Sequence, residues 1–333
     1  MKKTIYIFSS GTLKRKQNTL FFETEDGQKK YIPVENTGEI QVFGELNINK
    51  KLLEFLSQQE IIVHFYSHYG FYMGSFYPRE HYNSGEIIIR QAEFYLNKEK
   101  RVHLARNFVN GAIQNGIKVL KYYQNRNPKD ELANSLVKLN ELLNGISGCE
   151  DINQLMAIEG NAKDIYYRSF NHIIKDREFR FTYRSRRPPG SKINALISFG
   201  NSLLYTYCLS EIYKTHLDPR IGFLHTSNFR RFSLNLDIAE VFKPIIVDRI
   251  IFSLVNKGVL KNKHFIAELG GIYMNENGRK IFVQEMDERL KQTIKHRKLK
   301  RHVSYRTLIR MEAYKIEKHI LGDEEYKPWI AEW

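Results

Sequence analysis

The chain has 333 residues, of which 42% are hydrophobic and 13% aromatic, so it can form packed cores. This composition excludes an intrinsically disordered protein, and the length favours two domains. The 52 Lys and Arg against 37 Asp and Glu give a net charge of +15. An excess of that size indicates a polyanionic partner.

The positive charge is confined to one part of the chain. Residues 1–86 carry 10 basic and 10 acidic side chains, whereas the other 42 basic and 27 acidic side chains account for the whole excess. A charge that served only solubility would be spread more evenly, so the asymmetry favours nucleic acid as the partner. An anionic membrane is the alternative, but the sequence predicts no strongly amphipathic basic terminal helix.

Cysteines and targeting signals are sparse. Two cysteines are too few for a disulfide framework. The apolar run Ile5–Phe8 is too short for a signal-peptide core, and no run approaches membrane-spanning length. We therefore expect a cytoplasmic protein.

Residues 1–82 are expected to form a β-rich, β-sandwich-like domain. Short runs of β-branched and aromatic residues predict strands near 4–8, 19–22, 31–34, 39–43, 61–65 and 70–74. The pair Asp26-Gly27 predicts a hairpin between the second and third of these strands. One helix is expected over residues 49–59.

The rest of the chain is expected to be helical. Turn residues predict a linker over 83–90, followed by a larger domain over 91–333. Hydrophobic periodicity predicts helices over 91–125, 131–144, 151–174, 192–213, 234–256, 283–300 and 304–321. The fold class is therefore α+β, with an N-terminal β-rich domain and a larger all-α domain that carries the site residues.

Glu159 lies on the apolar stripe of the helix expected over 151–174. A carboxylate that faces a core has to be paired, neutralised or bound to a cation, because an isolated buried charge is very unfavourable. The apolar neighbours that recur at three- and four-residue steps are Ile152, Leu155, Met156, Ala162, Tyr166, Phe170 and Ile173.

Three more candidate ligands follow along the chain. Asp237 and Glu240 are three residues apart and project to one side of a helix. His225 precedes them, close enough for the loop over 226–233 to fold it back. Mixed carboxylate and imidazole ligands suit Mg²⁺ or Mn²⁺, so we expect Glu159, His225, Asp237 and Glu240 to form a metal site.

Each of these residues also has an alternative role in which it supports the fold and binds no metal. The sequence is also compatible with Asp237 as an acid at the end of a helix, where the helix dipole favours negative charge. Glu240 is equally typical of a solvated partner of Lys243, and His225 of a hydrogen-bonded core histidine. Spacing alone leaves these alternatives open.

Two basic segments are candidates for phosphate contacts. The first, over 184–192, is stiffened by proline and ends where a helix begins, and the main-chain N–H groups of a helix start favour anions. The second, over 289–301, has seven Lys or Arg and no acid among thirteen residues, although a solvated helix face is the usual explanation of such a run. The residues expected to bind DNA are Arg184, Arg186, Arg187, Lys192, Lys295, Arg297, Lys298 and Arg301.

Taken together, these segments make the chain resemble the CRISPR spacer-acquisition integrases, the Cas proteins numbered one. The resemblance spans both domains, and its motifs are specific in combination although each is weak alone. Glu240 stands where some members have Asp, which puts its role as a direct ligand in doubt. The stretches that carry the resemblance are Glu159-Gly160-Asn161-Ala162, residues 184–189 with 194–200, Gly222-Phe223-Leu224-His225, residues 233–244 with Asp248, and residues 304–308 with 312–315.

The resemblance implies a metal-dependent DNA endonuclease and integrase of CRISPR adaptation. Such an enzyme joins the 3′-hydroxyl ends of foreign DNA fragments to the CRISPR repeat by transesterification, and water in place of the hydroxyl gives hydrolysis. The implied catalytic residues are Glu159, His225 and Glu240, with Asp237 as a further metal ligand and Mg²⁺ or Mn²⁺ as the cofactor. The implied partners are DNA, a second copy of the chain bound through the β-rich domain, and the small Cas protein numbered two.

Two other functions remain open from the residues alone. A metal-dependent nuclease for branched DNA would use the same ligands without joining strands. A non-catalytic nucleic-acid scaffold would use the basic segments alone, with the acids and the histidine in structural roles.

Overall fold

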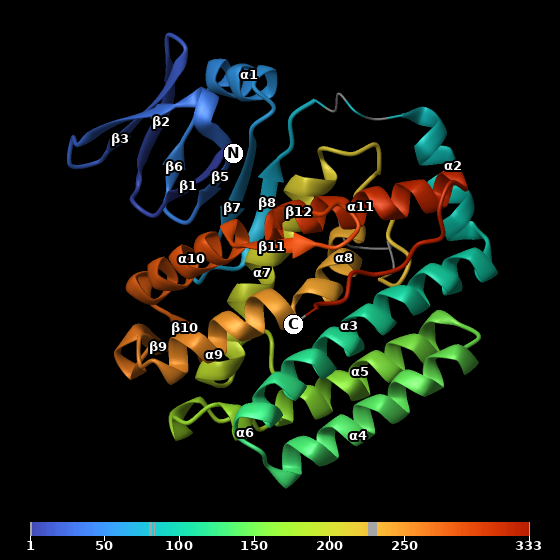
Figure 1. The fold of residues 1–333 in the computed structure, drawn as a ribbon. Helices are drawn as coiled ribbons and strands as arrows, with labels where there is room; N and C mark the ends of the chain where they lie inside the picture. Colours follow the sequence, from blue (N-terminus) through green and yellow to red (C-terminus); the bar gives the residue numbers. More distant parts are fainter. Residues whose placement is uncertain (1, 80–81, 83, 226–231, 333) are drawn as a thin grey trace. The chain divides into compact units, whose positions relative to one another are not determined.

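The computed structural model describes residues 2–79, 82, 84–225 and 232–332. The chain divides into two units, residues 1–81 and residues 82–333, beside the expected domain boundary at residue 82. Strands dominate the first unit and helices the second (Figure 1). This order confirms the predicted α+β fold class.

The first unit contains two four-stranded sheets. One has the order β1-β5-β7-β8, in which β1, β5 and β7 are parallel and β8 is antiparallel to β7. The other has the order β4-β3-β2-β6, antiparallel except for the β2–β6 pair. The strands are β1 (Lys3–Ile7), β2 (Gly11–Lys16), β3 (Thr19–Thr24), β4 (Lys29–Pro33), β5 (Thr37–Val42), β6 (Leu46–Asn47), β7 (Ile62–Tyr66) and β8 (Tyr72–Phe76).

Both sheets contribute to one hydrophobic core. Leu13 and Leu20 reach it from one sheet, Ile40 and Val63 from the other, and Leu52 from α1 (Lys50–Gln58). The turn between β3 and β4 contains a glycine at residue 27 with φ of 83°, as the hairpin signal predicted. The shared core gives this unit its sandwich-like character.

The second unit is built around α7, which is buried on nearly every side and packs against α8 and α11. Helix α3 packs against α4, α5 and α8, and α3, α4 and α5 run side by side in Figure 1. Among the described residues, no helix is both long enough and apolar enough to cross a membrane. The helices are α2 (Gly85–Leu96), α3 (Lys98–Arg126), α4 (Asp130–Gly145), α5 (Ile152–Arg168), α6 (Phe170–Ile173), α7 (Lys192–Ile212), α8 (Leu234–Phe242), α9 (Arg249–Asn256), α10 (Glu276–Lys291) and α11 (Tyr305–Leu321).

The linker expected over 83–90 is largely absent. Helix α2 begins at Gly85, so residues 85–90 are helical, while residue 83 lies outside the described residues. Ile87 is buried, and the buried Gln91 donates a hydrogen bond to Asp218 O at 2.9 Å. The helix packs from its first turns, which explains why it begins earlier than the turn residues indicated.

Three of the expected long helices are interrupted, and the one expected over 151–174 is divided into α5, which ends at Arg168, and α6, which begins at Phe170. The helix expected over 91–125 breaks at Asn97, whose side chain accepts a hydrogen bond from Lys100 N at 3.0 Å and caps α3. The helix expected over 234–256 contains a π-helical turn over Pro244–Asp248 between α8 and α9. Proline has no N–H to donate to the preceding turn, so the α-helical hydrogen bonding changes there.

The second unit is not all-α, because it also contains two hairpins: β9 (Phe265–Glu268) with β10 (Gly271–Met274), and β11 (Thr293–His296) with β12 (Arg301–Ser304). The helix expected over 283–300 is therefore wrong in its second half, since α10 ends at Lys291. Thr293 and Ile294 are β-branched, and the acid-free run offers no opposite charge four residues away to support a helix.

Candidate active site

Glu159 lies on the buried face of α5. Leu155 and Ala162, one turn before and after it, are buried beside it. The helix is fixed at its start by Asp151, whose side chain accepts a hydrogen bond from Gln154 N at 2.9 Å. Glu159 is only 6% exposed, so the predicted burial of this carboxylate is confirmed.

Asp237, in the first turn of α8, is surrounded by main-chain donors. Its Oδ2 accepts hydrogen bonds from Phe223 N at 2.6 Å and Leu224 N at 3.0 Å, and its Oδ1 accepts one from His225 N at 3.0 Å. Gly222 permits this approach, because a Cβ there would lie 2.9 Å from Asp237 Oδ2. A single carboxylate therefore holds the main chain in place from 223 to 225.

The same carboxylate orients the His225 ring. His225 Nδ1 lies 2.8 Å from Asp237 Oδ1. An ionised carboxylate only accepts hydrogen bonds, so Nδ1 carries the proton and Nε2 keeps its lone pair. Nε2 lies 3.8 Å from Glu240 Oε1, so the side of the ring that accepts is directed at the second acid of α8.

Glu159, His225 and Glu240 converge although they come from three separate segments of the chain. One ligand atom of each lies within 4.8 Å of the corresponding atoms of the other two. Residues 226–231, in the loop expected to fold His225 back, lie outside the described residues. Two carboxylates and an imidazole with a free nitrogen are a suitable donor set for Mg²⁺ or Mn²⁺, so the residues present fit the expected cation.

The geometry does not support Asp237 as a direct ligand. Its two oxygens already accept hydrogen bonds from three main-chain N–H groups and from the His225 ring. Asp237 is thus an acid in the first turn of its helix, which was the alternative to a metal ligand, and it also orients the His225 ring. Glu240 is 2% exposed, so the alternative in which it is solvated is wrong.

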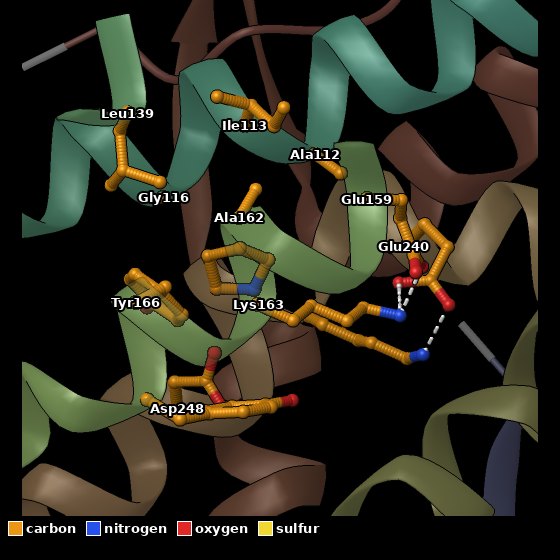
Figure 2. A pocket seen from close by; sticks show the side chains of 13 residues that line it. Ala112, Ile113, Gly116, Leu139, Glu159, Ala162, Lys163, Tyr166, Glu240 and Asp248 are labelled. Carbon is orange, nitrogen blue, oxygen red and sulfur yellow. Dashed lines mark hydrogen bonds and ion pairs between the residues drawn. The ribbon is translucent and has the colours of Figure 1, made fainter. Parts of the chain in front are cut away.

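Two lysines pair with the converging carboxylates. Lys163 contacts Glu159 and lies 3.0 Å from Glu240 Oε2, while Lys243 Nζ lies 2.5 Å from Glu240 Oε1. Figure 2 shows the Glu159 and Glu240 carboxylates side by side, with the Lys163 ammonium directed at both. Lys163 was not among the predicted site residues, although its position four residues after Glu159 is the spacing of a helical ion pair.

In this cluster, attraction between opposite charges shifts the pKa values more than burial does. Burial raises the pKa of Glu240, but the ammonium groups of Lys163 and Lys243 lower that pKa well below its ordinary range. Burial lowers the pKa of Lys163, but Glu240 and Glu159 raise it above its ordinary value. Both partners of this pair are therefore charged, the Glu240 carboxylate in a buried position and the Lys163 side chain about one-quarter exposed.

A cavity of about 40 Å³ lies beside these charges, with space for a few water molecules. Apolar side chains of α3, α4 and α5 line one side, and Asp248 and Tyr166 lie at the end away from Glu240 (Figure 2). Burial raises the pKa of Asp248 to about 8, although the Tyr166 hydroxyl and Lys243 oppose the shift. Asp248 Oδ1 has no hydrogen-bond partner among the described residues.

The first basic segment is partly committed to the fold. Arg184 donates to two side chains near the start of α7, at 3.1 Å and 2.9 Å. Lys192 is paired with Glu178. Arg186 and Arg187 are exposed. DNA binding by these four residues stays a prediction, and it is best supported for the two exposed arginines.

Residues 289–291 of the second basic segment end α10, and its residues 293–301 lie in the β11–β12 hairpin rather than on a helix face. Lys295, Arg297, Lys298 and Arg301 are all exposed on it. Arg297 and Lys298 pair with acidic side chains close to the C-terminus, at 2.6 Å and 3.0 Å. No ion pair joins Lys295 or Arg301 to another described residue, so these two have the charge most available to a phosphate.

Comparison with known proteins places the chain in a family. It matches the family described as "CRISPR associated protein Cas1" over residues 5–288. The "CRISPR-associated endonuclease Cas1 2" of Thermodesulfovibrio yellowstonii is 60% identical to it over 333 residues, which are 100% of both chains. The chain belongs to the Cas1 family.

Another Cas1 relative, the "CRISPR-associated endonuclease Cas1" of Thermotoga maritima, is 50% identical over 324 residues, which are 97% of this chain and 98% of the relative. A solved Cas1 structure from the same organism matches with a TM-score of 0.89 at 47% identity, covering 99% of this chain and 100% of that one. These matches confirm the resemblance drawn from the motifs and the fold.

Proposed function

We propose that this chain is a metal-dependent DNA endonuclease and integrase of CRISPR adaptation, which joins 3′-hydroxyl ends of foreign DNA to the CRISPR repeat. The observation that carries the proposal is the convergence of Glu159, His225 and Glu240, with ligand atoms within 4.8 Å of one another. The relatives described above are named CRISPR-associated endonucleases, which supports cleavage of a nucleic-acid chain.

In this proposal Glu159, Glu240 and His225 Nε2 hold the divalent cation. When bound, a divalent cation supplies stabilisation of the charge that develops on the phosphate and makes the attacking hydroxyl more acidic. Asp237 keeps the His225 proton on Nδ1, so that Nε2 stays available as a ligand. Lys163 and Lys243 place positive charge where the negative charge of the reacting phosphate grows.

The reaction exchanges one phosphodiester for another. The 3′-oxygen of the incoming strand forms a bond to phosphorus, and the bond from phosphorus to the 3′-oxygen of the target strand breaks. The proton of the attacking hydroxyl is lost, and the departing 3′-oxygen gains one. No protein nucleophile is required, and water in place of the hydroxyl converts the same step into a nick.

The charge distribution supports DNA as the partner of the helical unit. Residues 1–81 carry 10 basic and 9 acidic side chains, whereas residues 82–333 carry 42 basic and 28 acidic ones. In the proposal, the nearly neutral β-rich unit is the surface for a second copy of the chain. The basic unit binds DNA, and Cas2 bridges two such dimers.

The test is strand joining by the purified chain with Cas2, a duplex with 3′-hydroxyl ends, a supercoiled plasmid with a repeat, and Mn²⁺. We expect Glu159→Ala and His225→Ala to abolish joining and to keep most of the DNA affinity, because each removes a ligand of the cation. Asp164→Ala is the matched control, since Asp164 is an exposed acid on the same helix and is paired with Arg168.

The outcomes separate the three candidate functions. Full joining by either ligand variant, or joining in an excess of EDTA, would reject the proposed site. Cleavage that persists with blocked 3′ ends and never leads to joining would indicate a branched-DNA nuclease. DNA binding without any metal-dependent change in the strands would indicate a scaffold.

A further inference from the structure

The last residues of the described chain form a strap over the helical unit. After α11, Gly322 adopts φ of 88°, and residues 323–332 then run without regular secondary structure. Segments without regular secondary structure usually lie exposed on the surface. Here Tyr326 and Ala331 are almost completely buried, and Trp329 is buried as well. We call residues 323–332 the C-terminal strap.

Glu312 of α11 anchors the strap. Its Oε1 accepts hydrogen bonds from the Tyr326 hydroxyl at 2.8 Å and from Trp329 N at 2.9 Å. Its Oε2 accepts one from Lys315 Nζ at 2.8 Å. This carboxylate is fully buried, so both of its oxygens have the partners that a buried charge requires.

Asn115 of α3 joins the strap to α8. Its Oδ1 accepts a hydrogen bond from Ala331 N at 2.9 Å. Its Nδ2 donates to Trp329 O at 3.0 Å and to Val241 O at 2.7 Å. The amide is fully buried and uses its oxygen and both of its N–H groups, so it works as a bridge between two segments.

The contacts on α8 fall directly after Glu240. Val241 O receives the Asn115 hydrogen bond, and Phe242 stacks on Trp329 with ring centroids 5.5 Å apart and planes within 9° of parallel. A Cβ on Gly111 would lie 2.7 Å from Pro328 Cβ and 3.2 Å from Val241 Cγ2. The absence of a side chain at Gly111 of α3 therefore leaves the space that Pro328 of the strap and Val241 of α8 occupy.

The end of α8 needs external support. The helix has nine residues, and a π-helical turn that begins with Pro244 follows it. Helices shorter than about 12 residues are marginal alone, and proline donates no hydrogen bond to the preceding turn. The hydrogen bond from Asn115 and the ring of Trp329 supply contacts that α8 cannot make within itself.

We propose that the C-terminal strap, acting through Asn115 and Trp329, positions Glu240 for binding of the divalent cation. This inference rests on the proposed function and assigns to Asn115 and Trp329 the role of positioning residues. Neither side chain belongs to the group of candidate ligands. Their effect on the cation passes through the backbone of α8.

The test compares the full chain with Asn115→Ala and Trp329→Leu by amide hydrogen exchange across α8 and by Mn²⁺ binding measured with electron paramagnetic resonance. We expect exchange at 240–242 to become several-fold faster and the Mn²⁺ affinity to fall about tenfold in both variants. Trp329→Phe should restore most of the affinity, because it keeps an aromatic ring on Phe242.

Gln114→Ala is the matched control, since Gln114 neighbours Asn115 on α3 and hydrogen-bonds to Asn110 on the same helix. Equal Mn²⁺ affinity in the unmodified chain and both variants would overturn the positioning role, even if thermal stability fell. Unchanged exchange in α8 would overturn it too. The absence of Mn²⁺ binding by the unmodified chain would instead contradict the proposed function itself.

Discussion

Lys163 is the side chain that most directly opposes a divalent cation in the site. Its ammonium contacts Glu159 and lies 3.0 Å from Glu240 Oε2. We expect Lys163→Gln to bind Mn²⁺ about tenfold more tightly, because charge repulsion falls and both carboxylates lose a competing partner. Calorimetric titration with Mn²⁺ measures this change.

The control for this prediction is Lys138→Gln, which removes an exposed lysine of α4. Its Mn²⁺ affinity should equal that of the unmodified chain. Weaker Mn²⁺ binding by Lys163→Gln would show that the ammonium supports the cation site rather than competing with it.

Asp248 makes stability depend on pH. Burial raises its folded pKa to about 8, above the ordinary carboxyl value of 3.8, so folding favours the protonated form. The stabilising contribution of this acid is complete below about pH 4 and is lost as the pH rises through about 8. The side chain of Asp248→Asn stays neutral at every pH. Between about pH 5 and pH 9, the free energy of unfolding of this variant should therefore fall by a few kcal/mol less than that of the unmodified chain.

Urea unfolding at several pH values measures that difference. The groups that act on Asp248 besides burial are Tyr166, Lys243, Glu240 and Lys163. Parallel pH profiles for Asp248→Asn and the unmodified chain would contradict a raised pKa.

Individual residues differ in how far the sequence predicts their role. The burial of Glu159 followed from its place on an apolar stripe, which is a local property of the helix. The role of Asp237 did not, because its main-chain partners at 223–225 depend on the tertiary course of the chain. Spacing placed Asp237 near His225 but gave no way to distinguish a ligand from a residue that orients one.

At the scale of elements, hydrophobic periodicity predicted most helices. Its errors lie where hydrogen bonding of the backbone determines where a helix begins or ends. The break at Asn97 and the π-helical turn at Pro244 come from a capping side chain and a missing N–H. Neither changes the apolar pattern. The β11–β12 hairpin was missed because a basic run without acids has no periodicity to distinguish a helix from a strand.

The packing of α3 against α8 and the strap predicts opposite effects at two glycines of the same helix. Gly111→Ala should destabilise the unit by about 1–3 kcal/mol, because its Cβ would overlap Pro328. Gly116→Ala should be neutral or stabilising by up to about 1 kcal/mol. A Cβ there meets the Tyr166 ring at 3.4 Å, and alanine favours the helix.

Thermal unfolding of both variants measures this pair of effects, and each variant is the control of the other. Equal destabilisation by both substitutions would contradict the close approach at residue 111. A fall confined to Gly111→Ala would support it.

At the scale of the whole molecule, the charge asymmetry predicts how DNA affinity responds to salt. Each phosphate contact adds about 0.9 to the magnitude of the slope of log affinity against log salt. Replacing Lys295 and Arg301 together by Ala should reduce that magnitude by about 1–2. Replacing Arg297 and Lys298 should reduce it less, because both already pair with acids.

Fluorescence anisotropy of a labelled duplex at several salt concentrations measures the slope. Replacing Lys50 and Lys51, exposed on α1 of the nearly neutral unit, is the control and should leave the slope unchanged. The same slope for all three pairs would show that the hairpin does not contact DNA.

The separation of Glu159 and Glu240 along the chain has a thermodynamic consequence. An extended chain cannot hold both acids and His225 around one ion, so in the proposed function only the folded helical unit would bind the ion tightly. By mass action, free Mn²⁺ at about a hundred times its dissociation constant would add about 2.7 kcal/mol to the free energy of unfolding. The concentration of the ion in the cell would then regulate the lifetime of the folded enzyme together with its activity.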